Sequence, residues 1–308
     1  MLRRWCEGLE PQRPTRQHGA GEGYVKLHHF VYRTRAIVPD RDFATIVFAS
    51  ACSHGRVDGT AADRMSGQEP TLVLLPGNMC DARLWLGEGP VAGTLPLLGS
   101  RPVHHADLGR DDSIAAMAAR TLRDCDGPLI ACGFSMGAIV AAEMWVQASR
   151  RIRGLVLLGY NASADLPERA IHRPRQQGEA LAGGLERLLA EELKPNYLAA
   201  VNRSNPALLD LLKAMGMALG PEVFVRQSKA LRTRDDRRAI LPRIDVPVLL
   251  GCGRDDALCP PAIHQRWAAA IPDARLFVDE GAGHMLPLEA PATVAHQIET
   301  TFPAWGTA

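Results

Sequence analysis

The segment that most constrains the fold of this chain is the sequence Gly-Phe-Ser-Met-Gly at residues 133–137. It follows an apolar run at residues 128–132 and precedes a second one at residues 138–142. This order predicts a buried strand, a sharp turn with Ser135 at its apex, and a helix. A glycine at each end suits such a turn, because a helix that packs closely on its strand leaves no room for Cβ atoms. The Ser135 hydroxyl is then expected above the strand, at the positive end of the helix.

A histidine that fits the role of a base lies far downstream of Ser135. A serine hydroxyl is a poor nucleophile at neutral pH, so it needs a base within hydrogen-bond reach and a group that orients the base. His284 lies in the glycine-rich loop at residues 279–287, after a short β-rich run at residues 274–278. The other histidines weighed for this role lie in strand-like or helical patterns that favour structural positions: His104, His105, His264 and His296.

Two adjacent carboxylates compete for the role of the orienting acid. An apolar run at residues 246–253 predicts a strand that leads into Asp255 and Asp256. Asp256 lies four residues before Pro260, and we favour it as the acid. Asp255 is the alternative, and it also suits a turn residue whose side chain bonds nearby backbone N–H groups.

Two backbone N–H groups are candidates for binding the oxyanion that forms during acyl transfer. One belongs to Met136, the residue after the serine. The other is expected in the loop at residues 76–81, which follows a strand predicted at residues 71–75. Asn78 is the favoured donor in that loop, and Met79 is the alternative.

Together these segments resemble the α/β-hydrolase superfamily over residues 70–305. The resemblance implies a mostly parallel sheet with helices on both faces and a helical cap inserted after the sixth strand. It implies a catalytic triad of Ser135, Asp256 and His284, because the family pattern G-x-x-D-x-x-x-P fits Asp256. Within the superfamily, the chain is similar to small esterases, lactonases and cofactor-free haloperoxidases. An aromatic residue like Phe134 before the serine is also seen in esterases that demethylate pimeloyl-carrier-protein esters.

The chain departs from the commonest family pattern at three places. Pro76 precedes Gly77 where histidine is usual, Phe134 stands where histidine or tryptophan is frequent, and Ala138 replaces a glycine. None of these changes removes a catalytic atom. Haloalkane dehalogenases and epoxide hydrolases of this fold use an aspartate at the position of Ser135, so the serine favours ester-like acyl chemistry.

The expected function is therefore that of a serine hydrolase that cleaves a carboxylic ester, thioester or lactone through an acyl-serine intermediate. One alternative is an acyltransferase or a cofactor-free perhydrolase with the same triad. Another is a relative that binds a ligand without catalysis. No metal or organic cofactor is expected, because the triad and the backbone donors supply all the chemistry.

The composition limits the expected partners and location. The net charge of +1 favours neither nucleic acid nor a membrane surface, so a small-molecule ester or acyl substrate is expected. The basic run at residues 226–238 suits a solvated helix face, with docking of an acidic acyl-carrier protein or an acidic substrate as the alternative. The seven cysteines form no C-x-x-C pair, which fits a reducing cytoplasm, and no apolar run reaches membrane-spanning length.

The chain divides into an N-terminal extension and one catalytic domain. Residues 1–64 are rich in arginine and histidine and are expected to be disordered or not native, with Met65 as the natural start. Residues 65–308 are expected to form the hydrolase domain, with residues 162–240 as the cap. The expected strands lie at residues 24–32, 43–51, 71–75, 101–108, 128–134, 153–159, 246–252 and 274–279. The expected helices begin near Ala82 and span residues 113–125, 136–149, 261–270 and 291–302.

Leucines at helical spacing run through the cap, at residues 181–193 and again at residues 208–212. Such stripes pack a cap on its main domain, and the few side chains above the serine line an apolar pocket. Met215 and Met217 are candidates for that lining, because methionine adapts to irregular shapes. Packing of the cap is the favoured role for both.

Overall fold

A computed structural model describes residues 68–99, 101–193 and 197–303. The extension at residues 1–64 and the strands expected at residues 24–32 and 43–51 lie outside these ranges. The described chain builds a six-stranded parallel sheet in the order β4-β1-β5-β6-β7-β8. Its strands are β1 (Thr71–Leu75), β4 (Val103–His105), β5 (Leu129–Phe134), β6 (Ile152–Leu158), β7 (Val248–Gly253) and β8 (Ala274–Asp279).

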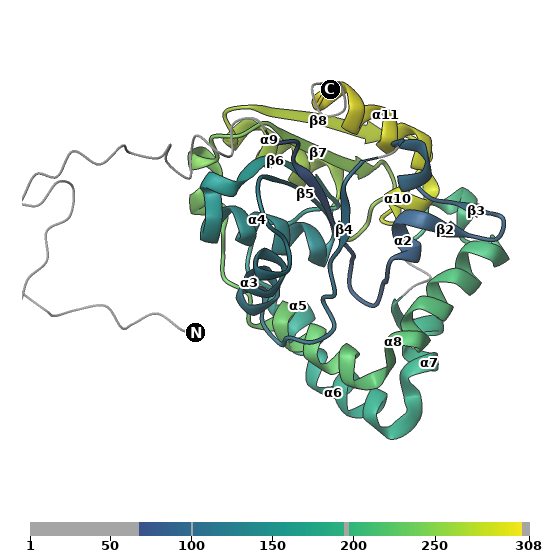
Figure 1. The fold of residues 1–308 in the computed structure, drawn as a ribbon. Helices are drawn as coiled ribbons and strands as arrows, with labels where there is room; N and C mark the ends of the chain where they lie inside the picture. The colour runs from purple at the N-terminus through teal and green to yellow at the C-terminus, as the bar shows by residue number, and fades with distance from the viewer. Residues whose placement is uncertain (1–67, 100, 194–196, 304–308) are drawn as a thin grey trace, which may run out of the picture. The chain divides into compact units, whose positions relative to one another are not determined.

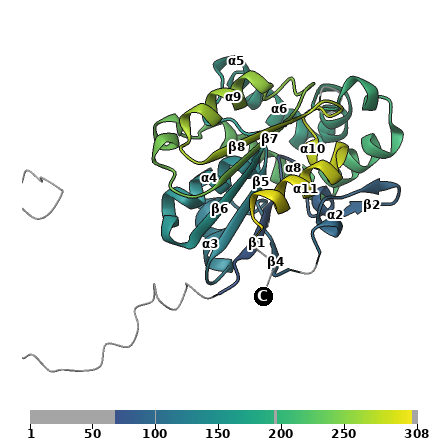
Figure 2. The same cartoon turned by 90° about the horizontal axis from the view of Figure 1, so that it is seen from above.

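Helices cover both faces of this sheet, as Figure 2 shows. On one face lie α3 (Ile114–Asp124), α4 (Met136–Ala148) and α9 (Pro261–Ala270). On the other lie α2 (Arg83–Leu86), α10 (Leu286–Glu289) and α11 (Pro291–Thr301). The remaining short helical turns of the main domain are η1 (Leu95–Leu97) and η2 (Ser149–Arg151).

The alternation of side chains along the strands explains the two layers. In β1, Val73 and Leu75 join the core beneath α3 and α4, whereas Leu72 and Leu74 join the core beneath α2 and α11. Successive residues of a strand point to opposite faces, so an unbroken apolar strand fills both cores. Residues Leu129–Phe134 are accordingly all buried. The fold expected from the sequence is confirmed.

The segment after β1 differs from the expectation. The helix predicted from Ala82 is one turn long, and a hairpin of β2 (Gly87–Glu88) and β3 (Val91–Ala92) follows it. Gly87 has a φ of 74°, where only glycine avoids strain, so the helix ends there and the chain turns back. The strand expected at residues 101–108 is also shorter and spans Val103–His105.

The cap follows β6, as expected, and is helical. It contains α5 (Pro167–Ala170), α6 (Arg173–Glu179), η3 (Ala180–Gly184), α7 (Leu185–Arg187), η4 (Leu188–Leu193), η6 (Ala200–Asn202), α8 (Pro206–Arg232) and η7 (Arg238–Arg243). The long helix α8 lies beside α6 and α7 (Figure 1). It bends at Gly220 and Pro221, because proline interrupts the hydrogen bonding of a helix.

The two halves of α8 have different neighbours. Leu208, Leu212 and Met215 lie before the bend and pack into the core on the α2 and α11 side of the sheet. Phe224 lies after the bend and packs with Leu188 and other cap residues in a separate apolar cluster. The bend therefore lets one helix close the core and also cover the end of the sheet where the loops after β1 and β5 lie. No helix in the described ranges has the length and apolar character needed to cross a membrane.

Candidate active site

The turn between β5 and α4 holds Ser135 in an unusual backbone conformation. Ser135 has a φ of 53° and a ψ of −114°, which is a strained combination for a residue with a side chain. The surrounding packing enforces it: a Cβ atom on Gly137 would lie 2.1 Å from the Leu75 carbonyl oxygen, and one on Gly133 would lie 2.3 Å from the Gly137 oxygen. The close approach of helix and strand that the two glycines predict is therefore present.

A continuous hydrogen-bonded chain joins Ser135 to His284 and Asp256. His284 Nε2 lies 3.0 Å from Ser135 Oγ, and His284 Nδ1 lies 2.8 Å from Asp256 Oδ2. His284 and Asp256 are each 2% exposed, so the chain is shielded from water apart from its serine end. The three residues follow β5, β7 and β8, whose carboxyl ends meet at one edge of a parallel sheet.

The structure brings Asp256, and not Asp255, to the histidine. Burial disfavours the Asp256 carboxylate, but the charge and hydrogen bond of His284 and the N–H group of Cys259 outweigh it, and the pKa of Asp256 lies below its ordinary value. The carboxylate is therefore ionised at neutral pH and holds a proton on His284 Nδ1. Asp255 instead accepts a hydrogen bond from the Ala200 N–H group in the cap, at 3.1 Å.

The loop that carries His284 is fastened to the segment that leads from the cap. The His284 N–H group donates to the Tyr197 carbonyl oxygen at 2.7 Å. Glu289 accepts hydrogen bonds from the Gly283 and Ala199 N–H groups and from the Asn202 amide. These contacts tie the histidine loop to the cap.

The predicted oxyanion donors Asn78 and Met136 both line the cavity that contains Ser135. Met136 begins α4, so its N–H group lies at the positive end of a helix. The alternative donor, Met79, is committed elsewhere: its N–H group donates to Gln227 Oε1 at 2.8 Å. The Asn78 side chain donates to the same oxygen at 3.0 Å.

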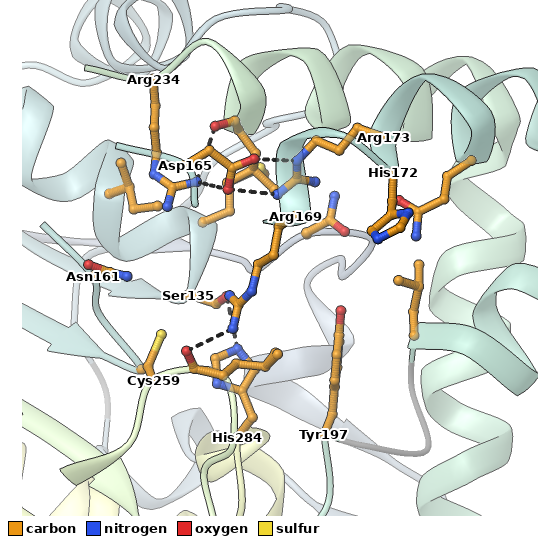
Figure 3. Close-up of a pocket in the computed structure, with 18 of the residues that line it drawn as sticks. Ser135, Asn161, Asp165, Arg169, His172, Arg173, Tyr197, Arg234, Cys259 and His284 are labelled. Atoms are coloured by element: carbon orange, nitrogen blue, oxygen red, sulfur yellow. Dashed lines mark hydrogen bonds and ion pairs between the residues drawn. The ribbon is translucent and has the colours of Figure 1, made fainter. Parts of the chain in front are cut away.

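The cavity above Ser135 has a volume of about 270 Å³ and a mixed lining. Apolar side chains such as Ile139, Phe224 and Leu231 form part of its wall. The cap contributes charged and polar groups that the sequence analysis did not expect, and Figure 3 shows several of them: Asp165, Arg169, His172, Arg173 and Arg234.

Two residues considered for the cavity lining lie elsewhere. Neither Met215 nor Met217 lines the cavity. Met215 lies before the bend in α8 and is buried in the sheet core, whereas Met217 lies nearby on the helix and is 43% exposed. The apolar part of the expected lining is present, but the short helices α5 and α6 add polar side chains to it.

The basic run at residues 226–238 is only in part a solvated face. Lys229, Arg232 and Arg238 are exposed. The others bond groups elsewhere in the structure: Arg226 to the Gly109 carbonyl oxygen, Arg234 to Asp165, and Arg237 to the buried Glu143. Arg226 and Arg237 therefore fix the cap to the main domain, whereas the Arg234 ion pair lies within the cap.

Comparison with known proteins identifies the family. Residues 72–297 match the family model described as the alpha/beta hydrolase family. The chain belongs to this family. Among curated relatives of this hydrolase is a pimeloyl-[acyl-carrier protein] methyl ester esterase from Aromatoleum aromaticum, which is 28% identical over 249 residues, with 75% of this chain and 97% of the relative covered.

Solved structures share the fold of this hydrolase. A thermophilic esterase from Thermogutta terrifontis has a TM-score of 0.65 at 24% identity and covers 78% of this chain and 92% of its own. An enol-lactonase from Burkholderia xenovorans has a TM-score of 0.65 at 21% identity, and the match covers 77% of this chain and 92% of the lactonase. Hydrolysis is thus the type of activity that these names share.

No metal centre is evident in the part of this hydrolase that the structure describes. Its residues form no group of three or more His, Cys, Asp or Glu side chains suited to a metal ion. His264 is a buried histidine outside the triad, and its Nε2 accepts a hydrogen bond from the Tyr160 N–H group at 3.0 Å. Burial lowers the pKa of His264 and keeps it neutral, as this structural role requires.

Gln227 is a site residue that the sequence analysis missed. It is 1% exposed, accepts from Asn78 and Met79, and donates from Nε2 to the Leu108 carbonyl oxygen at 3.2 Å. The sequence pattern that could have revealed Gln227 is a polar residue at a helical position between apolar ones. Four residues share this buried face of α8: Phe224, Gln227, Ser228 and Leu231. Gln227 thereby positions the loop that carries Asn78.

Replacing Gln227 with leucine is expected to slow the reaction of Ser135 with a serine-directed fluorophosphonate by about tenfold. The change removes the acceptor that Asn78 and Met79 share, which costs about 1–3 kcal/mol and releases the loop from its position. The labelling rate and the melting temperature of the Gln227→Leu variant provide the test. Gln265→Leu, at an exposed position of α9, is the matched control. Unchanged labelling in a Gln227→Leu protein of lower melting temperature would limit this residue to a structural role.

Proposed function

We propose that this hydrolase cleaves a carboxylic ester, thioester or lactone through an acyl-enzyme intermediate on Ser135. The observation that carries the proposal is the unbroken chain of hydrogen bonds from Ser135 Oγ through His284 to Asp256, at 3.0 and 2.8 Å. A buried, oriented base beside a serine on a strained turn is an arrangement that serves nucleophilic attack.

In the acylation step, Ser135 Oγ attacks the carbonyl carbon while His284 Nε2 takes the hydroxyl proton. The carbonyl oxygen becomes negative and accepts hydrogen bonds from the Met136 and Asn78 N–H groups. The carbon–oxygen or carbon–sulfur bond to the leaving group then breaks, and His284 gives its proton to that group. Asp256 keeps the imidazole in the tautomer with Nδ1 protonated and stabilises its cation.

Water regenerates the enzyme in the second half of the reaction. His284 removes a proton from water as the water oxygen attacks the acyl carbon, and the same backbone donors hold the second oxyanion. Collapse of this intermediate releases the carboxylic acid and returns the proton to Ser135 Oγ. The cycle consumes one ester and one water and needs no other reactant.

The proposal includes a setting for this reaction. The catalytic unit is residues 65–308, with residues 162–240 as its cap. A cytoplasmic location is supported by the cysteines of the described ranges, which are buried and form no disulfide: Cys80, Cys125, Cys132, Cys252 and Cys259. The cavity volume of about 270 Å³ suits a small acyl group, since ligand cavities are commonly larger. The name of the Aromatoleum relative also makes a carrier-bound acyl ester a substrate worth testing beside free esters.

Ser135→Ala is expected to abolish both ester turnover and covalent labelling by a fluorophosphonate, because it removes the hydroxyl that His284 Nε2 contacts. A panel of 4-nitrophenyl esters of increasing acyl length measures the turnover, and intact mass measures the label. Ser149→Ala, at the end of α4 and away from the cavity, is the matched control. Full labelling of the Ser135→Ala protein would overturn the assignment.

Asp256→Asn is expected to lower kcat by about 10³ to 10⁴, because an amide favours the wrong tautomer of His284. Asp255→Asn is the neighbouring control, and its kcat should stay within about threefold of the unaltered protein, since the Asp255 side chain accepts a hydrogen bond from the cap backbone and not from His284. Steady-state kinetics on one short ester compare the two. A larger loss in the Asp255→Asn protein would reverse the choice between these carboxylates.

A further inference from the structure

Asp165, Arg173 and Arg234 are three charged cap residues that line the cavity and pair with one another. Asp165 Oδ2 accepts from Arg173 Nε at 2.7 Å, and Asp165 Oδ1 accepts from Arg234 Nη1 at 2.9 Å. The Asp165 side chain is 2% exposed. Figure 3 shows both guanidinium groups directed at this carboxylate. The two arginines therefore donate hydrogen bonds to a carboxylate of the cap itself.

Arg169 differs from these two arginines. Its side chain extends from α5 into the cavity that Ser135 and His284 also line (Figure 3). Among the described residues, its one hydrogen bond is from Nη2 to the Leu258 carbonyl oxygen at 3.3 Å, and no carboxylate lies within ion-pair distance. Arginine has five N–H donors and keeps its charge at all ordinary pH values, so most of its binding capacity remains available.

The other acidic residues of the lining do not neutralise Arg169. Glu192 is bonded to Gln176 and to Arg175 and Arg187 on the cap. Glu168 precedes Arg169 on α5, but it is exposed and makes no ion pair with it. Arg169 is therefore a partly buried cation of the cavity lining that has no acidic partner in the described structure. A partly desolvated cation of this kind is costly unless a ligand compensates it.

We propose that Arg169 binds a carboxylate of the substrate, so that the preferred substrates are small esters, thioesters or lactones that carry a free carboxylate near the scissile carbonyl. The inference rests on the proposed function, since it assigns a substrate class to the same site. A guanidinium group and a carboxylate match in shape and form two parallel hydrogen bonds. The carboxylate would take the N–H donors of Arg169 that the protein leaves unused.

The position of Arg169 also limits the length of the substrate. Its guanidinium group lies within the same small cavity as Ser135, so the carboxylate and the scissile carbonyl are separated by a few bonds only. Monomethyl succinate, with the carboxylate on the acyl side, and acetoxyacetate, with the carboxylate on the alcohol side, fit this description. Methyl succinamate and acetoxyacetamide are their neutral counterparts of nearly the same shape.

Binding to the Ser135→Ala protein tests the inference without turnover. Calorimetry is expected to give a Kd for monomethyl succinate or acetoxyacetate at least about tenfold lower than for the matching amide. The gain of even one charge-assisted hydrogen bond is enough for a tenfold change in affinity. This preference should disappear in a protein that carries Arg169→Gln as well, and Arg169→Lys should retain part of it. Equal affinity for acid and amide in both pairs, or no binding of either, would overturn the inference.

Kinetics on the protein with its serine intact provide the second measurement. Arg169→Gln should lower kcat/KM for the preferred carboxylate ester by about tenfold or more and leave the matching amide ester within about twofold. Arg232→Gln removes an exposed arginine of α8 and should change neither value. Equal losses for acid and amide would assign Arg169 a role other than carboxylate binding.

The outcomes separate this inference from the proposed function. A protein whose Ser135 reacts with fluorophosphonate and hydrolyses neutral esters, but shows no preference for carboxylates, keeps the proposed function and loses the inference. A protein that binds the carboxylates through Arg169, yet neither reacts with fluorophosphonate nor hydrolyses any ester, keeps the anion site and loses the proposed function.

Discussion

The close packing of α4 against β1 and β5 is the constraint on which the rest of the site depends. Gly137 lies so near the Leu75 carbonyl oxygen that the chain must turn sharply after β5, and Ser135 takes a positive φ as a result. The parallel sheet then brings the loops after β1, β7 and β8 to the same edge. These loops carry Asn78, Asp256 and His284, so backbone packing determines where the polar groups meet.

Sequence patterns predicted the residues whose positions depend on single strands. Ser135, Asp256 and His284 each follow an apolar run, and the structure joins them by hydrogen bonds. Met136 and Asn78 line the same cavity. A strand and the loop after it are local in sequence, and the order of strands in this fold brings the loops together. The fold class and the position of the cap were predictable for the same reason.

The residues that the sequence did not predict depend on how the cap docks. Gln227 bonds Asn78 across 149 positions of the chain, and no local pattern specifies that approach. Arg169 reaches the cavity from a four-residue helix whose position depends on the ion pairs of Asp165. The hairpin after α2 was missed because Gly87 ends the helix within one turn. Apolar periodicity placed Met215 correctly in a packing stripe with Leu208 and Leu212, but the adaptable shape of methionine was no guide to the cavity lining.

The measurement that tests the central claim most directly is detection of the covalent intermediate. Rapid acid quench of the protein with an activated short-chain ester, followed by peptide mass analysis, should show one acyl group, located on the peptide that contains Ser135. The adduct should form within the first turnover and disappear as the substrate is exhausted. Turnover of the ester without any acyl adduct, or with the adduct on another residue, would contradict the account.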